Sequence, residues 1–191
     1  LLSSTSTEIA QGEVLQLQHK GEIDMLEETY FKITSSKTAA LFSAATKVGA
    51  ILGEKEAKYK EALEFYGKNI GLTFQIADDA LDYNSNLKLF GKEIGNDFFE
   101  GKVTLPIILL YQKVSNSEKK LLKNLFNKEK RDKDELNYAL NLIKQYNIIK
   151  DCYKKADHFI NLASNALSIF EESKEKTILK NLTTFSIERN F

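Results

Sequence analysis

The most informative segment of this 191-residue chain is Gly71-Leu-Thr-Phe-Gln-Ile-Ala-Asp-Asp-Ala-Leu-Asp-Tyr83. At 100° per residue, its amide and carboxylate side chains fall on one stripe of a helix: Gln75, Asp78, Asp79 and Asp82. From Leu72 onward the rest of this helix is apolar nearly all round, which is typical of a buried helix. We therefore expect the three carboxylates, here called the acid stripe, to face an internal cavity rather than open water.

The acid stripe predicts a metal site. Three carboxylates this close repel one another, and their pKa values rise unless a cation lies among them. Carboxylate oxygens are the ligands of hard cations. We therefore expect Mg²⁺ at Asp78, Asp79 and Asp82.

The composition limits the class of protein. Hydrophobic residues make up 42% and charged residues 28%, which is ordinary for a globular chain, and the length suits one domain over residues 1–191. One proline and nine glycines among many helix-forming residues indicate an all-α fold. The formal net charge is zero, so no overall field favours nucleic acid or an anionic membrane. A single cysteine, Cys152, excludes internal disulfides and fits a cytoplasmic location, and its apolar neighbours predict core packing.

A second helix is expected from a capping box at Asp24 and Glu27 to about Leu52. Lys37 lies in the middle of its inward apolar stripe, and a lysine there needs a partner. The simpler alternative is that Lys37 extends its ammonium group to the edge of the helix. The acid stripe favours an anion ligand instead. The other inward positions are Tyr30, Ile33, Leu41, Ala44, Val48 and Ile51.

The acidic helix is expected to start near Glu56 and to end in a loop, residues 87–102, that carries Lys92, Asp97 and Lys102. The loop returns two ammonium groups toward the acid stripe, which suits a Mg²⁺-bound polyphosphate. A solvated surface loop is the alternative. Thr104 is expected to cap the next helix. The apolar residues of that helix predict that it is part of the core. Amphipathic helices are expected at about 117–126, 134–146, 149–170 and 174–189.

Four segments of the chain, in the order in which the family has them, resemble the trans-type isoprenyl (polyprenyl) diphosphate synthases. The segment 74–82 is similar to the second aspartate-rich motif of that family, and 91–106 to the lysine-bearing segment that follows it. Upstream, 37–42 is similar to the Lys-Thr motif and 12–16 to a further family segment. The residues of these segments lean toward those of bacterial octaprenyl diphosphate synthases.

The resemblance implies a fold and a reaction. The fold is an all-α orthogonal bundle of the isoprenoid synthase type with a central cavity, usually in a homodimer. The reaction condenses an allylic diphosphate with isopentenyl diphosphate after metal-assisted departure of pyrophosphate. Membrane contact would be peripheral at most, through the apolar product.

The resemblance also implies roles for the matched residues. By similarity, Asp78 and Asp82 ligate Mg²⁺, Asp79 orients the water shell of the metal, and Asp97 supports the metal side. The residues implied to contact the allylic diphosphate are Lys37, Lys92 and Lys102. The residues implied to line the reacting prenyl end are Thr38 and Gln75.

One departure from the family concerns the start of the chain. A first aspartate-rich motif and the basic residues that hold isopentenyl diphosphate do not precede the matched segments. We therefore expect the chain to correspond to the later three-fifths of a synthase, with N-terminal helices missing. Three interpretations stay open. The chain is a fragment of a working synthase, a non-catalytic polypeptide (a decayed gene product or a subunit that needs a partner chain), or a related terpene cyclase.

We predict that this chain alone has little or no condensation activity, because one metal-binding motif and one substrate site are not among its residues. The measurement is product formation from radiolabelled isopentenyl diphosphate and an allylic primer. Robust turnover by the isolated chain would contradict the prediction.

Overall fold

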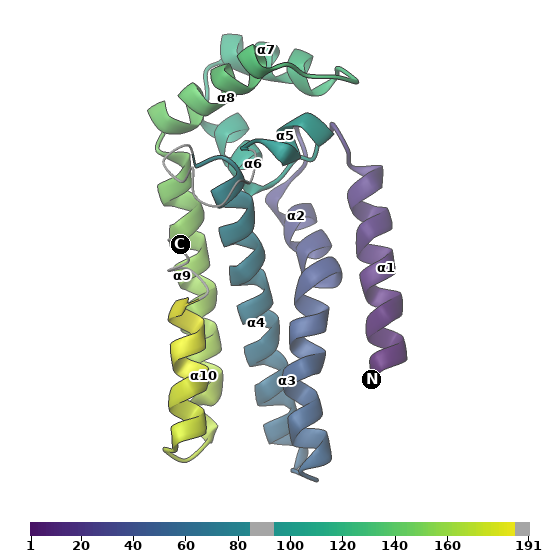
Figure 1. Ribbon diagram of the computed structural model, residues 1–191, viewed down its shortest axis with the longest axis vertical. Coiled ribbons are helices and arrows are strands. Elements are labelled where there is room, and N and C mark those ends of the chain that lie inside the picture. The colour runs from purple at the N-terminus through teal and green to yellow at the C-terminus, as the bar shows by residue number, and fades with distance from the viewer. Residues whose placement is uncertain (85–93, 186–191) are drawn as a thin grey trace.

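The computed structural model describes residues 1–84 and 94–185, and the described part is built from helices and turns. A long helix, α4, occupies the middle of the molecule and packs most extensively against α3 and α9 (Figure 1). The short helices α5 to α8 gather at one end of these long helices, and α1 stands at one side (Figure 1). The elements are α1 (Leu2–Gln18), α2 (Glu27–Thr34), η1 (Ser35–Ala39), α3 (Ala40–Leu52), α4 (Ala57–Asp82), α5 (Asn96–Glu100), α6 (Leu105–Lys113), α7 (Asn116–Phe126), α8 (Lys133–Gln145), α9 (Ile148–Ala166), η2 (Leu167–Ile169) and α10 (Lys174–Phe185).

The all-α prediction is confirmed. Among the described residues, no helix combines the length and the apolar character that crossing a membrane requires. The core prediction for α6 is also confirmed, since Leu105, Ile107 and Leu110 are completely buried. Cys152 is completely buried as well, and burial raises the pKa of its thiol.

The helix that carries Lys37 differs from the prediction at its start. It begins at Glu27 with Leu26 as the N-cap, and no capping box forms at Asp24. Asp24 instead pairs with Lys123 at 3.1 Å, and Glu27 pairs with Lys155 at 2.7 Å. The expected capping box was therefore wrong, because contacts with distant helices hold both carboxylates.

The same helix also contains a π-helical turn, η1, that the sequence did not predict. A π-helical turn holds one more residue than an α-helical turn, so it rotates the inward face of the following helix. Leu41, expected to point inward, is 55% exposed, while its neighbour Ala40 is 8% exposed. Ile51, near the end of α3, is also exposed, whereas Ala44 is 4% exposed, as expected. The expected stripe is therefore correct before η1 and at Ala44, and wrong at Leu41 and Ile51.

Thr104 occupies the N-cap of α6, but its side chain makes no capping hydrogen bond. Pro106, in the first turn, has no N–H to offer. The N–H groups of Ile107 and Ile108 bond to the carbonyl oxygen of Thr104 instead. The expected side-chain cap was wrong.

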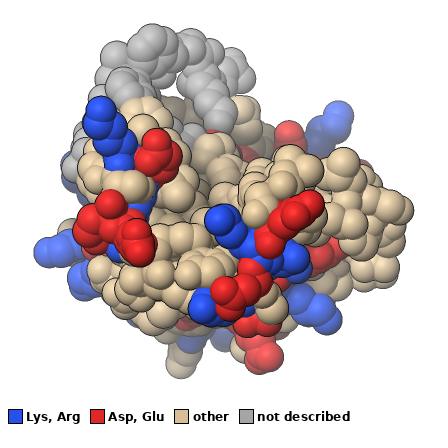
Figure 2. All heavy atoms as spheres, turned by 90° about the horizontal axis from the view of Figure 1, so that it is seen from below, with Lys and Arg blue, Asp and Glu red and all other residues tan. Residues whose placement is uncertain are grey.

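The described surface mixes charges of both signs. On the end of the molecule shown in Figure 2, basic and acidic side chains are interspersed. Lys47 and Glu64, on α3 and α4, form one such ion pair at 2.7 Å. Partly exposed pairs of this kind contribute about 0–1 kcal/mol each.

Glycine sets the distance between α3 and α4. A Cβ atom at Gly67 would overlap the hydroxyl of Thr46 and the carbonyl group of Phe42. One at Gly71 would lie 2.5 Å from the Cα of Ala39. The space that these glycines leave is therefore filled by the neighbouring helical segment.

We predict that Gly67→Ala lowers the free energy of unfolding by about 1–3 kcal/mol, because α3 must move away from the added methyl group. The matched control is Gly49→Ala on α3. Nothing lies within 4 Å of a Cβ atom at Gly49, so this change should stabilise the helix by about 0.5–1 kcal/mol. Urea unfolding followed by circular dichroism measures both. Equal effects of the two substitutions would show that α3 and α4 are not in close contact.

Candidate active site

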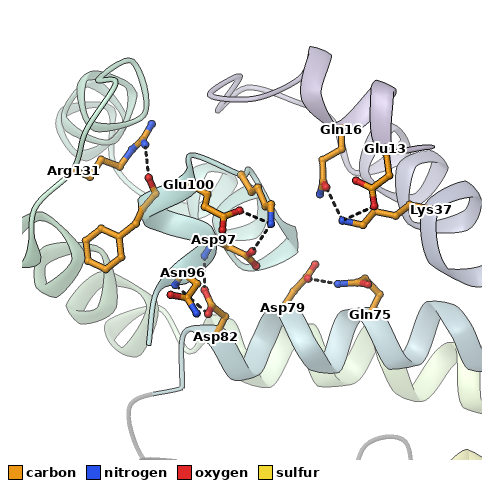
Figure 3. Close-up of polar contacts among 12 residues, drawn as sticks. Glu13, Gln16, Lys37, Gln75, Asp79, Asp82, Asn96, Asp97, Glu100 and Arg131 are labelled. Atoms are coloured by element: carbon orange, nitrogen blue, oxygen red, sulfur yellow. Dashed lines mark hydrogen bonds and ion pairs between the residues drawn. The ribbon is translucent and has the colours of Figure 1, made fainter. Parts of the chain in front are cut away.

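The predicted site residues within the described part of the chain come from three places. The C-terminal half of α4 carries the acid stripe and Gln75, η1 carries Lys37 and Thr38, and α5 with the turn after it carries Asp97 and Lys102. Figure 3 shows Asp79 and Asp82 on α4 facing the segment that carries Asp97. Lys92 lies outside the described residues.

Asp79 is the buried centre of a hydrogen-bond network. Its carboxylate is 3% exposed and accepts two bonds of 2.7 Å, one from the Tyr30 hydroxyl and one from the Gln75 amide. The Gln75 carbonyl oxygen accepts a bond of 2.8 Å from the hydroxyl of Thr38. This chain of bonds joins α2, η1 and α4 around one carboxylate.

Burial raises the pKa of Asp79 to about 7, and the negative charge of Asp97 adds to the rise. The bonds from Tyr30 and Gln75 oppose it, while the charge of Asp78 adds a smaller increase. Asp78 and Asp97 therefore lie close enough to Asp79 to repel it, as the sequence predicted for carboxylates that share a site.

Asp82 holds α5 in place. Its two carboxylate oxygens accept hydrogen bonds from the backbone N–H groups of Asn96 (3.2 Å) and Asp97 (3.0 Å), the first two residues of α5. Such a carboxylate satisfies N–H groups that a helix start leaves without partners. The sequence predicted a metal ligand at Asp82, but it did not predict that Asp82 would bond to the start of α5.

Asp97 and Lys102 form a mixed-charge group with Glu100. The Lys102 Nζ atom lies 2.6 Å from Glu100 and 3.6 Å from Asp97. Burial raises the pKa of Asp97, the charge of Lys102 lowers it, and the charge of Asp78 raises it again. For Lys102, burial would lower the pKa, but the bond to Glu100 and the charge of Asp97 raise it.

Lys37 reaches α1 rather than the acid stripe. Its Nζ atom donates to the side-chain oxygen of Gln16 at 2.8 Å and lies 3.3 Å from Glu13 (Figure 3). The close approach is possible because Gly12 packs directly on the backbone of Lys37. Lys37 therefore has the polar partner that its position required, and its role as an anion ligand stays a prediction.

The donor set fits a hard divalent cation. Among the residues that the structure describes, no three His, Cys, Asp or Glu side chains are close enough together to hold a metal ion as they stand. Even so, Asp78, Asp79 and Asp97 already repel one another, and a cation would relieve that repulsion. Asp78, Asp82 and Asp97 are the residues that would hold it.

Comparison with known proteins identifies the family. The family model described as polyprenyl synthetase matches residues 1–143. The chain belongs to the polyprenyl synthetase family. It is similar to the all-trans-nonaprenyl-diphosphate synthase (geranyl-diphosphate specific) of Rhodobacter capsulatus, with 36% identity over 187 residues, 98% of this chain and 57% of the relative. The octaprenyl diphosphate synthase of Haemophilus influenzae is 28% identical over the whole chain, which covers 58% of that relative.

Solved polyprenyl synthases share the fold. A polyprenyl synthase from Caulobacter crescentus, in complex with calcium and isoprenyl diphosphate, superposes with a TM-score of 0.94 at 33% identity. The match covers all of this chain and 58% of that enzyme. This member of the polyprenyl synthetase family thus spans a little over half the length of the relatives it matches.

The sequence analysis did not predict several residues of this site in the polyprenyl synthetase chain. Tyr30 was assigned only to the inward apolar stripe, although a buried tyrosine hydroxyl needs a polar partner. Glu13 and Gln16 stand three residues apart on α1, a spacing that places both on one helix face. Glu100 follows Asp97 by the same spacing. These spacings were the available signals.

We predict that the stability of the metal-free chain falls as the pH rises from 5 to 8. The folded-state pKa of Asp79, about 7, lies above the value of 3.8 expected when unfolded. Protonation of this carboxyl therefore stabilises the fold fully below about pH 4, and the effect disappears above pH 7. The expected loss is on the order of 2 kcal/mol, measured by urea unfolding in EDTA.

Asp79→Asn should remove this pH dependence. The matched control is Asp24→Asn, because Asp24 is an exposed carboxylate whose pKa the bond to Lys123 lowers. That variant should keep the slope of the parent chain. Parallel pH profiles for Asp79→Asn and the parent would contradict the assignment.

Proposed function

We propose that this chain carries the second aspartate-rich half of the active site of a trans-polyprenyl diphosphate synthase. Such a prenyltransferase joins an allylic diphosphate to isopentenyl diphosphate and releases pyrophosphate. The supporting observation is that the charge of Asp97 acts on the buried carboxyl of Asp79, and that Asp97 lies 3.6 Å from the ammonium group of Lys102. The relatives, named as prenyl diphosphate synthases, agree with the proposal.

Mg²⁺ is the proposed cofactor. Asp78, Asp82 and Asp97 would hold it, and Asp79 would orient the water around it. When bound, a divalent ion supplies electrostatic stabilisation of the charge that develops on a leaving pyrophosphate. The calcium and isoprenyl diphosphate bound to the Caulobacter crescentus enzyme support a divalent ion next to a diphosphate.

The lysines neutralise the remaining phosphate charge. In the proposed complex, the ammonium groups of Lys37 and Lys102 donate to oxygens of the allylic diphosphate, together with Lys92. Glu13 and Glu100 pair with the first two of these lysines in the ligand-free chain. Such pairing fixes the position of each ammonium group before the diphosphate arrives, which reduces the ordering cost of binding.

Thr38 and Gln75 are proposed to line the reacting end of the prenyl chain. Thr38 donates its hydroxyl proton to Gln75, and Gln75 donates an amide proton to Asp79. The lone pairs of the Thr38 oxygen then remain to face an electron-poor prenyl carbon. A dipole fixed in this way stabilises developing positive charge without having to reorient.

Two other functions remain candidates. One is a chain that acts only with a partner polypeptide. A terpene cyclase would need no isopentenyl diphosphate, and membership of the polyprenyl synthetase family argues for the synthase. We propose a homodimer as the assembly, as the resemblance implies.

We predict that the chain binds inorganic pyrophosphate only when Mg²⁺ is present. Asp97→Asn should weaken this binding at least tenfold because it removes a metal ligand. Lys102→Ala should weaken it about tenfold or more through the loss of a charged hydrogen bond. Isothermal titration calorimetry with MgCl₂ and sodium pyrophosphate measures each affinity.

The matched controls for these variants are Glu64→Gln and Lys47→Ala. They change an acid and a lysine that are paired in the same way, at 2.7 Å. Glu64 lies about 20 Å from Asp78 along α4, by the helical rise per residue. Both controls should bind as the parent does. If Asp97→Asn binds as tightly as the controls, the proposed metal site is wrong.

A further inference from the structure

A pocket with mostly apolar walls lies where α2, α6 and α9 meet. Its volume is about 710 Å³, within the range of roughly 300–1,000 Å³ that is typical of small-molecule sites. None of the predicted site residues that the structure describes lines it, so it is a different hollow from the candidate active site. The pocket is therefore a candidate for a second binding site.

Two aromatic rings and a leucine form the apolar part of this pocket. The rings of Phe31, on α2, and Phe159, on α9, meet at an angle of 59° with their centroids 5.3 Å apart. Phe31 also packs edge-on against Tyr30 at 5.2 Å, and His158 packs in the same way against its neighbour Phe159. Leu109 of α6 is 6% exposed, whereas both phenylalanines are only half-buried. The rings are thus held in place by their neighbours, yet they still offer apolar surface to a ligand.

The rim of the pocket carries more positive than negative charge. Its lysine and acidic side chains are Lys113, Lys154, Lys155, Glu27 and Asp151. Lys155 pairs with Glu27 at 2.7 Å. Lys113 and Lys154 instead share Asp151, with one ammonium group on each carboxylate oxygen. Among these described lining residues, ammonium groups therefore outnumber carboxylates by one.

The two lysines that share Asp151 can take a further partner. An ammonium group has three N–H donors, and its bond to Asp151 uses one of them. The side chains of Lys113 and Lys154 are 45% and 65% exposed, and ion pairs this exposed are weak enough to rearrange. A second carboxylate between these lysines would give each ammonium group a partner of its own, at the edge of an apolar surface.

We propose that this pocket binds a small amphipathic carboxylic acid. The apolar tail of the acid lies on Phe31, Phe159 and Leu109, and its carboxylate accepts hydrogen bonds from Lys113 and Lys154. Both parts of the ligand are required, because the tail is removed from water and the head answers the excess positive charge. This site lies beyond the proposed function, since neither a metal nor a diphosphate takes part in it.

The experiment titrates the isotope-labelled chain with sodium decanoate, below its micelle concentration, and follows the backbone amides by NMR. We expect saturable shifts of the amides around Phe31, Lys113 and Phe159. Decanol has the same tail without the charge, and acetate has the same head without the tail. Each of these two should bind at least about tenfold more weakly than decanoate.

Two substitutions test the rim. Lys113→Gln and Lys154→Gln each remove the excess positive charge and leave Asp151 with one lysine, so decanoate should bind about tenfold more weakly or worse. The matched control is Lys123→Gln on α7, because Lys123 does not line the pocket and pairs with Asp24 at 3.1 Å. This control should bind decanoate as the parent does. The same spectra report that each variant is folded.

Several outcomes would overturn the proposed site. If decanol binds as tightly as decanoate, or if Lys113→Gln and Lys154→Gln bind within twofold of the parent, the pocket does not recognise a carboxylate. Shifts confined to α3, α4 and α10 would place decanoate in a smaller apolar hollow of about 290 Å³ between those helices. If decanoate gives no saturable shifts but the chain sediments with phosphatidylglycerol vesicles, the pocket faces a membrane surface instead. The titration contains neither Mg²⁺ nor pyrophosphate, so these outcomes are independent of the proposed function.

Discussion

The structure depends on the burial of one carboxylate at the junction of three helical segments. An ionised carboxylate is stable away from water only when donors surround it. For Asp79 these donors are Tyr30 from α2 and Gln75 from its own helix, and Thr38 from η1 bonds to Gln75 in turn. Each partner must reach hydrogen-bond distance, so the hydrogen bonds of this carboxyl group fix how α2 and η1 approach α4. The glycines of α4 allow that approach, because Gly71 lets the backbone of Ala39 lie in contact.

The π-helical turn serves the same junction. Lys37 and Thr38 are adjacent in sequence, yet Lys37 bonds to α1 and Thr38 bonds to α4. The turn also moves Ala40 into the interior in place of Leu41, so that a small residue follows the site. Single π-helical turns occur often at functional sites, where they redirect a few side chains without ending the helix. Here the redirected residues are two that the family resemblance assigns to substrate.

Residue patterns were sufficient for the features that repeat regularly along a helix. The acid stripe, the buried α6 and the all-α fold follow from periodicity and composition, which act within a few residues. Contacts between distant segments were not predictable in this way. Asp82 bonds to N–H groups 14 and 15 residues further along the chain, and Lys37 pairs with a residue 21 or more positions earlier.

The capping boxes show where a local sequence pattern predicts a contact correctly and where it does not. The pattern of an oxygen-bearing residue followed three positions later by glutamate forms real capping boxes at Ser115 and Asp132, where both partners are local. At Asp24 the same pattern forms no capping box, because Lys123 of α7 pairs with Asp24 and Lys155 of α9 pairs with Glu27. A local signal thus holds only where no distant charge competes for the same oxygen.

Internal pairing of charges determines how the site would respond to a ligand. Lys37 and Lys102 each have acidic partners, so the ligand-free chain leaves neither ammonium group dependent on water alone. A diphosphate would therefore replace Glu13 and Glu100 as acceptors, and the gain in energy would be the difference between the two sets of bonds. A metal-bound diphosphate competes better than a bare one, since the cation also relieves the repulsion between Asp79 and Asp97. In the proposed complex, the metal and the anion would therefore stabilise each other's binding, because the cation would offset the negative charge of both the carboxylates and the diphosphate.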